Sequence, residues 1–425
     1  MRKIGLVALL ALSGVFGFEH KIHGQFGSFT KWGFNDQKLN KNAGIAPTDS
    51  FSSVMGSLNY TAKFADLISI TAGGALGGLA YDSTDNGASG PTQVQYTYFN
   101  ANYEKGRAQG YMIQNVNIGI DHKNVYLRLG RYEAGKVGEW FSGFNEGAEG
   151  YVAFSDFKIW AFASGKRGFA YNQWFYEFYR VFGYGDTQPK REIYGAGFDY
   201  NTDKIKASLF AYGADSIFFA PGVSLDFDTA GGEENSVSSV TKVRVLVPIA
   251  LGSNISGTDW GNGPNWGIIG KNTTTLWIDE KVRLGKYFVG AGVYKNFGNA
   301  NELIGRYGNP LGSVVDVWTA SAYDIGFALS DMLGRNALTG YLRAGASYGD
   351  FSWSILGRLT DSPRSAEQSL ALLVNYKVRD DISVGGKLEG LMDTTKAGYS
   401  LNGHSLTANR TDDRSHLFFY ISHTF

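Results

Sequence analysis

Hydrophobic and polar residues alternate along many segments of the chain. In "SVMGSLNYTAKF", residues Val54, Leu58 and Tyr60 share one parity, and polar residues such as Ser57 and Asn59 occupy the other. The segments "KVRVLVPI", "FSWSILGRLT" and "SLALLVNYKVRD" repeat this pattern. A period of two places successive side chains on opposite faces of a β-strand. Helical periodicity is nearly absent, so the pattern predicts an all-β protein whose strands have two unlike faces.

Turn residues divide the alternating segments into about eighteen expected strands. The weakest pair is 223–229 with 239–250, and without it about sixteen strands would remain. We expect the strands at residues 20–34, 51–64, 68–81, 111–122, 125–133, 149–156, 157–165, 191–201, 204–214, 223–229, 239–250, 273–284, 287–297, 337–348, 351–361, 367–378, 382–393 and 416–425.

The connections between these strands are alternately short and long along most of the chain. The short ones contain the turn residues Asp66, Asn124, Asp156, Asp203, Gly285, Asp350 and Asp381. Bacterial outer-membrane barrels have short periplasmic turns and long external loops. We therefore expect residues 18–425 to form a single transmembrane antiparallel β-barrel with both termini periplasmic. Either strand count would leave an aqueous channel.

The N-terminal segment has the features of a secretory signal peptide. In "MRKIGLVALLALSGVFGFEHK", Arg2 and Lys3 precede a short apolar run, and small residues lead to an expected cut near Gly17. This pattern predicts a signal peptide over residues 1–17 and export from the cytoplasm. No later run approaches the ~18 apolar residues of a spanning helix. These features suit an outer-membrane barrel, although a secreted soluble β protein shares most of them.

Composition argues against several classes of function. Lys and Arg together number 39, as do Asp and Glu, so the charge balance gives no reason to expect a nucleic-acid partner. Cysteine is absent, which excludes disulfides and thiol catalysis. His20 and His23 are three apart on a strand and point to opposite faces, so we expect no metal site there. No triad, phosphate loop or dinucleotide motif is present, so we expect no enzyme activity and no cofactor.

The final segment, "SHLFFYISHTF", has an apolar parity consisting of Leu417, Phe419, Ile421 and Phe425. A free edge this apolar would invite aggregation, so we expect this strand to pair with the first one and to face the lipid of the outer membrane. A terminal Phe425 on such a strand resembles the signature by which outer-membrane proteins reach their assembly machinery. It implies periplasmic chaperones and that machinery as partners. Phe418 and Tyr420 fall on the other parity, so we expect packing there to narrow the lumen.

Three patches carry a family resemblance: "LRLGRYE" (127–133), "SGFNEGAE" (142–149) and "FAYNQW" (169–174). With the signal and the terminal Phe425, they resemble the Hof-type outer-membrane porin family of Helicobacter and related bacteria. That family is distantly similar to the OprD-type substrate-selective porins. The resemblance implies passive diffusion of small hydrophilic solutes across the outer membrane. It implies a third external loop, about residues 135–147, folded into the pore, and it leaves open whether the protein is a monomer or a trimer.

Charged residues near this loop are candidates for the narrowest part of the pore. If the resemblance holds, the loop contributes three of them, which face Arg128 and Arg131: Lys136, Glu139 and Glu146. Arg131 has the parity of Leu127 and Leu129, so it must lie beyond the lipid band or be turned inward by a bulge. The alternative is that these are ordinary solvated loop charges.

Charges on the polar parity of the strands are candidate pore-lining residues. The bases outnumber the acids among them: Lys206, Arg244, Asp279, Lys281, Arg283, Arg343, Arg358, Lys377, Lys387 and Glu389. A row of bases lowers the barrier for anions, so we expect a weak preference for anionic or carboxylate solutes. Alternatively, these bases pair with loop acids or extend toward the rim.

Two further interpretations remain. Long external loops also suit an adhesin or surface receptor. The aromatic segment "GFAYNQWFYEFYR", residues 168–180, suits an interfacial girdle, a patch where loops pack, or a platform that stacks on sugars.

Overall fold

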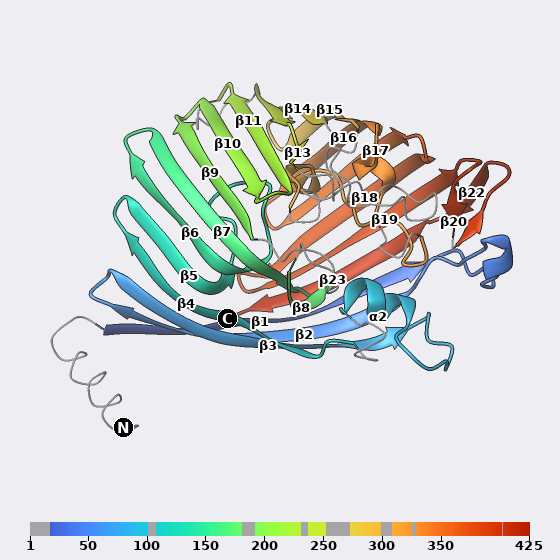
Figure 1. The fold of residues 1–425 in the computed structure, drawn as a ribbon, viewed down its shortest axis with the longest axis horizontal. Helices are drawn as coiled ribbons and strands as arrows, with labels where there is room; N and C mark the ends of the chain where they lie inside the picture. The colour runs from blue at the N-terminus through green and yellow to red at the C-terminus, as the bar shows by residue number, and fades with distance from the viewer. Residues whose placement is uncertain are drawn as a thin grey trace.

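The computed structural model describes residues 18–100, 108–180, 192–230, 237–251, 273–298, 308–324, 329–401 and 403–425. The expected signal peptide, residues 1–17, lies outside this part of the chain. Strands make up most of the described residues (Figure 1). No helix among them is long and apolar enough to cross a membrane.

Eighteen of the described strands form the wall of a closed antiparallel β-barrel. Each pairs with the wall strands before and after it, and β23 pairs with β1 to close the ring (Figure 1). The wall strands are β1 (Phe18–Gly33), β2 (Phe51–Phe64), β3 (Ile68–Asp82), β4 (Tyr111–His122), β5 (Val125–Glu133), β6 (Phe144–Phe154), β7 (Phe157–Ala170), β9 (Ile193–Asn201), β10 (Ile205–Ala214), β11 (Phe218–Asp228), β12 (Val237–Leu246), β14 (Thr274–Leu284), β15 (Tyr287–Phe297), β16 (Leu338–Tyr348), β17 (Phe351–Asp361), β18 (Ser365–Arg379), β19 (Ile382–Thr395) and β23 (His416–Thr424).

The prediction of eighteen wall strands is confirmed, and the alternative count of sixteen is wrong. The weakest predicted pair is present, because β11 pairs with β12 from Gly222 opposite Leu246 to Asp228 opposite Val240. β12 ends before Pro248, which cannot donate to the ladder, and the two-residue β13 (Ile249–Ala250) then continues the pairing with β11.

Two strands begin five residues earlier than the sequence predicts. β6 begins at Phe144 instead of residue 149, and β11 begins at Phe218 instead of residue 223. Both additions are paired on two sides, β6 with β5 and β7, and β11 with β10 and β13. This pairing satisfies the backbone of segments whose own strand propensity is weak. As a result, residues 144–147, which were predicted to belong to the third loop, lie in β6.

Side chains alternate between an exposed apolar face and a buried face along the wall. Leu209, Leu342 and Leu370 are 64%, 69% and 62% exposed, whereas the neighbouring Phe210 and Tyr341 are each 4% exposed. In a closed barrel the buried parity faces the interior and the exposed apolar parity faces lipid. We call these two parities inward and outward.

The last strand is fixed to the first along its whole length. Backbone hydrogen bonds of 2.9 and 3.1 Å join Phe425 to Gly24. Leu417 and Phe419 lie on the outward face, while Phe418 is buried. The predicted pairing of the C-terminal strand with the N-terminal one is therefore confirmed.

The two ends of the barrel differ in their connections. At one end, the turn end, strands are joined by two or three residues, as at Asp66, Asp156 and Asp381, except that eight residues join β11 to β12. The opposite end, the loop end, has the longer connections, apart from the three-residue connections 215–217 and 362–364. The longer ones contain the short helix α2 (Gln93–Tyr98), the strand β8 (Phe175–Tyr179), the small pair β20 (Ser400–Leu401) and β21 (His404–Ser405), the strand β22 (Arg410–Asp413), and the 3-10 turns η1 (Lys41–Ala43), η4 (Pro310–Ser313) and η5 (Asp331–Leu333).

Candidate functional site

The connection between β5 and β6, segment 134–143, packs against the inward face of the wall. Val137, Trp140 and Phe141 are buried in one apolar cluster with inward residues of β7 and β10. The rings of Phe141 and Phe162 lie 4.6 Å apart. The Tyr212 hydroxyl accepts a hydrogen bond of 3.5 Å from the Trp140 backbone N–H. Apolar packing therefore fixes this segment inside the ring of strands.

A charged contact extends the same segment to β11 and β12. Glu139 Oε1 lies 2.6 Å from Arg244 Nε and also accepts a hydrogen bond from Ser224. Arg244 Nη1 lies 2.5 Å from Asp226 Oδ1. Arg244 is 6% exposed, so it is enclosed between two carboxylates.

Beside this contact lies a cavity of about 270 Å³ lined by residues of segment 134–143 and of β7, β9, β10, β11 and β12. Lys158 Nζ is neutralised by Asp199 Oδ2 at 2.7 Å, and Asp199 also accepts from Trp160 Nε1 at 2.9 Å. Lys206, by contrast, has no ion pair with another described residue. The cavity therefore has an available ammonium group on its wall.

The connection between β15 and β16 also packs inward, through segment 308–337, which is described except for residues 325–328. Leu311 and Val315 join an apolar cluster with inward residues of β14, β15, β16 and β17. The other contacts are ionic. Asp316 lies 2.6 Å from Lys387, Asp324 lies 2.6 Å from Arg414, and Asp331 pairs with Arg364.

The charge of Asp316 follows from its surroundings. Burial raises the pKa of its carboxyl group, but the Lys387 ammonium outweighs burial and leaves the pKa lowered. Asp316 is therefore charged over a wide range of pH, and it continues to bind Lys387 across that range.

A third inward element is the hairpin formed by the end of β7 and by β8. Its tip reaches the opposite wall, where the Asn172 carbonyl accepts a hydrogen bond of 2.5 Å from Ser53 Oγ. The Asn172 side-chain amide also donates a hydrogen bond of 3.5 Å to the Ile421 carbonyl on β23. The hairpin therefore spans the interior between β7 and the β1, β2 and β23 walls.

The three inward elements touch one another. A Cβ atom on Gly308 would lie 3.0 Å from backbone atoms of Trp140, Phe141 and Ser142, so glycine allows segments 134–143 and 308–337 to approach closely. The rings of Trp174 in the hairpin and Trp318 are 4.5 Å apart. Together these contacts place the three elements within one interior region.

The predicted narrow-site residues separate into two groups. Arg128 is inward, donates to Ser69 Oγ at 2.7 Å and lies over the Tyr126 ring at 5.4 Å. Lys136 lies over the same ring at 5.9 Å. With Glu139, these residues border the interior.

Arg131 and Glu146 form the other group, and the structure does not bring them to Arg128. Both have the outward parity of their strands, as the alternation at Leu127 and Leu129 indicates. They pair with each other at 2.7 Å, and Lys166 joins Glu146 at 2.8 Å. Arg131 also lies over the ring of Phe178 in the β7–β8 hairpin at 4.5 Å, so the place of this pair in the pore stays a prediction.

The predicted wall charges all lie on the inward parity, and most of them have a charged partner. The partners are Asp279 for Arg343, Asp228 for Arg283, Glu367 for Arg358, Asp380 for Lys377, Glu389 for Lys387, and both Glu139 and Asp226 for Arg244. Lys281 lies over the Phe288 ring at 4.4 Å and, like Lys206, has no ion pair with a described residue. Pairing with acids therefore accounts for most of these bases, and lysines remain as the exceptions.

Sequence reasoning missed several inward charges. Lys31 is fully buried and binds Asp49 at 2.9 Å and the Ala320 carbonyl at 2.7 Å. Lys242 alternates with Val243 on β12, so parity alone would have found it. The loop acids that hold segment 308–337 have no periodic signal and could not have been found in this way.

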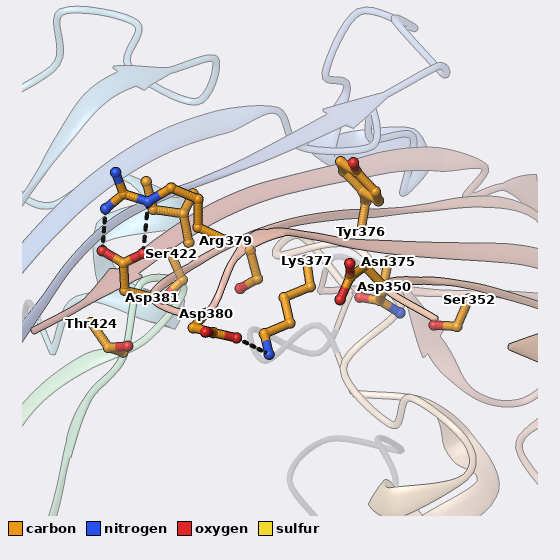
Figure 2. Close-up of a pocket in the computed structure, with 12 residues that line it drawn as sticks. Asp350, Ser352, Asn375, Tyr376, Lys377, Arg379, Asp380, Asp381, Ser422 and Thr424 are labelled. Carbon is orange, nitrogen blue, oxygen red and sulfur yellow. Dashed lines mark hydrogen bonds and ion pairs between the residues drawn. The ribbon is translucent and has the colours of Figure 1, made fainter. Parts of the chain in front are cut away.

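A second cavity, of about 370 Å³, lies at the turn end and is drawn in Figure 2. Lys377 and Asp380 point toward each other there, with their charged atoms 2.6 Å apart. Arg379 binds Asp381 through two hydrogen bonds of 2.9 and 2.5 Å. Because these bases are matched by acids, the turn end has no excess of free positive charge in this cavity.

Solved structures with the same fold come from bacterial Occ proteins. Acinetobacter baumannii OccAB4 superposes with a TM-score of 0.65 at 10% identity, covering 96% of this chain and 98% of that one. Pseudomonas aeruginosa OccK5 (OpdH) gives 0.63 at 13% identity, and P. aeruginosa OccK8 (OprE) gives 0.65 at 11%, both with the same coverage. No curated protein sequence matches the chain. A family described as "Putative outer membrane protein" matches residues 5–425, and the chain therefore belongs to this family of outer-membrane proteins.

Proposed function

We propose that this protein is a porin through which small hydrophilic solutes diffuse passively across the outer membrane, with a weak preference for anionic or carboxylate solutes. Its family and its closed barrel with a polar inward face support this function. In this proposal the turn end faces the periplasm and the loop end faces outward. Phe425, which directly follows β23 and is exposed, serves recognition by periplasmic chaperones and the barrel assembly machinery.

The observation that carries the anion preference is a group of inward lysines without acidic partners. Lys206, Lys242 and Lys281 lie on β10, β12 and β14, and none forms an ion pair with another described residue. The acids nearest to them in the strand register, Asp226 and Asp279, pair with arginines instead. Ammonium groups without an ion pair keep part of their field in a narrow aqueous space and lower the barrier to anions.

Segments 134–143 and 308–337 and the β7–β8 hairpin support the view that the pore is narrower than an eighteen-strand ring alone would allow. Their apolar and ionic contacts with the inward wall occupy lumen space. A narrow pore passes only small solutes, and in such a pore a few wall charges are enough to favour anions over cations.

Reversal potentials of the purified protein in a planar bilayer with a salt gradient test the proposal. We expect the sign of the reversal potential to indicate a preference for anions. The triple variant with Lys206→Gln, Lys242→Gln and Lys281→Gln should have a reversal potential closer to zero. Lys204→Gln, in the exposed turn before β10, is the matched control and should leave it unchanged. Cation selectivity of the wild type would contradict the anion preference.

Liposome swelling separates the porin from an adhesin or surface receptor. Entry of small sugars or amino acids into protein-loaded liposomes is expected for a porin. Liposomes that stay impermeable would contradict the porin and leave surface binding as the function.

A further inference from the structure

Three buried carboxylates meet where segment 308–337 touches the wall. Asp331 comes from η5, Glu367 from β18 and Asp393 from β19, and they are 3%, 2% and 5% exposed. Each offers an oxygen atom, and these atoms lie within 4.8 Å of one another. Carboxylate oxygens at such distances repel strongly when charged, so the arrangement needs positive charge.

The strand register makes this need greatest at Asp393. It lies directly opposite Glu367 on β18 and directly opposite Asp412 on β22. Like charges opposite each other on neighbouring strands destabilise a sheet. The position therefore has acids on both sides and a third acid, Asp331, in contact from the loop.

Each of the surrounding acids has its own arginine. Asp331 pairs with Arg364, Glu367 with Arg358, Asp412 with Arg410 and Asp324 with Arg414. Asp393 has neither an ion pair nor a hydrogen bond with any described residue, and its Oδ1 is buried. A buried carboxylate without a partner is strongly destabilising unless a cation or a proton compensates it.

We propose that Asp331, Glu367 and Asp393 bind one divalent cation of the calcium or magnesium class. Hard cations of this class prefer carboxylate oxygens, and oxygens bound to one Ca²⁺ at about 2.4 Å lie no more than about 4.8 Å apart. The ion supplies the charge that Asp393 lacks. It joins η5 to β18 and β19, so it fixes segment 308–337 to the wall at the loop end.

Two other ways to compensate Asp393 give different results in the same test. A proton on Asp393 would need no metal. Arg364 has an Nε and an Nη2 without partners, and its side chain could turn toward Asp393. Either arrangement predicts that no cation binds at this position.

Calorimetric titration of CaCl₂ and of MgCl₂ into the full-length protein in detergent, free of lipopolysaccharide and treated with chelator, tests the proposal. Burial raises the pKa of Asp331, so the titration is done at mildly alkaline pH, where protons compete least. We expect one ion per chain and an affinity at least tenfold weaker for Asp393→Asn. Asp380→Asn, at an exposed aspartate of the turn end, is the matched control and should bind as the wild type does.

Thermal unfolding provides the second measurement. The wild type should unfold at a higher temperature with Ca²⁺ than with chelator, and Asp393→Asn should lose this difference while retaining the heat-modifiable gel mobility of a folded barrel. The proposal is overturned if the wild type binds neither ion, or if Asp393→Asn binds as tightly as the wild type. These measurements involve no transport, so their outcome is independent of the proposed porin function.

Discussion

Segments 134–143 and 308–337 both pack on the inward wall, but different forces hold them. The first is fixed mainly by Val137, Trp140 and Phe141 in an apolar cluster. The second adds a series of ion pairs to its apolar contacts, among them Asp316 with Lys387 and Asp324 with Arg414. Apolar packing depends little on pH or on the screening of charges by salt, whereas a buried ion pair depends on the charge of each member. We therefore expect the second segment to respond to changes in charge and the first to respond to changes in volume.

The largest effect is expected at Lys387, which is 7% exposed and lies 2.6 Å from Asp316 and 2.7 Å from Glu389. Lys387→Met leaves both carboxylates without their cation and should lower the free energy of unfolding by about 3–5 kcal/mol. Urea unfolding in lipid vesicles, followed by tryptophan fluorescence, measures this change.

Lys377 is the matched control for Lys387. It lies on the neighbouring strand β18 and pairs with the exposed Asp380. Lys377→Met should cost less than about 1 kcal/mol, because solvent screens an exposed pair. Equal losses for the two variants would show that the buried pairs do not hold segment 308–337.

The second effect tests the apolar side of the comparison. Trp140 is 1% exposed, and Trp140→Ala should lower the free energy of unfolding by about 3 kcal/mol. The loss is at the lower end for a buried tryptophan because segment 134–143 can relax into part of the space that the indole leaves. The same urea experiment at low and high salt should give the same loss. Lys136→Ala, in the same segment, is the control and should cost less than about 1 kcal/mol. A loss for Trp140→Ala that depends on salt would contradict apolar docking.

The wall of this barrel could be predicted from the sequence, because alternation alone carries the necessary information. Parity placed Arg244, Lys281 and Lys387 on the inward face, where the structure also has them. Strand starts were harder to predict, as at Phe144, because glycine-rich residues there are held by pairing on both sides.

The interior contacts could not be predicted in this way. Asp316 and Lys387 are 71 residues apart, and nothing periodic in segment 308–337 marks the acid that reaches β19. Glu139 was identified as a candidate, but its partner Arg244 was assigned to a separate group of wall charges. Loop contacts of this kind depend on how the chain returns into the barrel, which local patterns do not specify.

A smaller effect is expected when the pH is lowered. Because the pKa of Asp316 is lowered, its pair with Lys387 stabilises the fold fully at neutral pH. This stabilisation is lost only as the pH falls below the ordinary aspartate pKa of about 3.9. The difference in unfolding free energy between the wild type and Asp316→Asn should therefore stay constant from neutral pH to about pH 5 and then narrow below about pH 4. Urea midpoints across this range measure it. Narrowing that begins above about pH 5 would mean that Lys387 does not lower the pKa.

The smallest effect concerns the point where the two segments meet. Gly308→Ala places a methyl group 3.0 Å from the backbone of residues 140–142, so the segments must separate slightly, at a cost of about 1 kcal/mol. A double-mutant cycle with Trp140→Ala shows whether the two regions act independently. Because Trp140→Ala lets segment 134–143 move, we expect the Gly308→Ala loss to shrink by at least about 0.5 kcal/mol in that background. Strict additivity would mean that each segment is held by its own part of the wall and that their contact contributes nothing to stability.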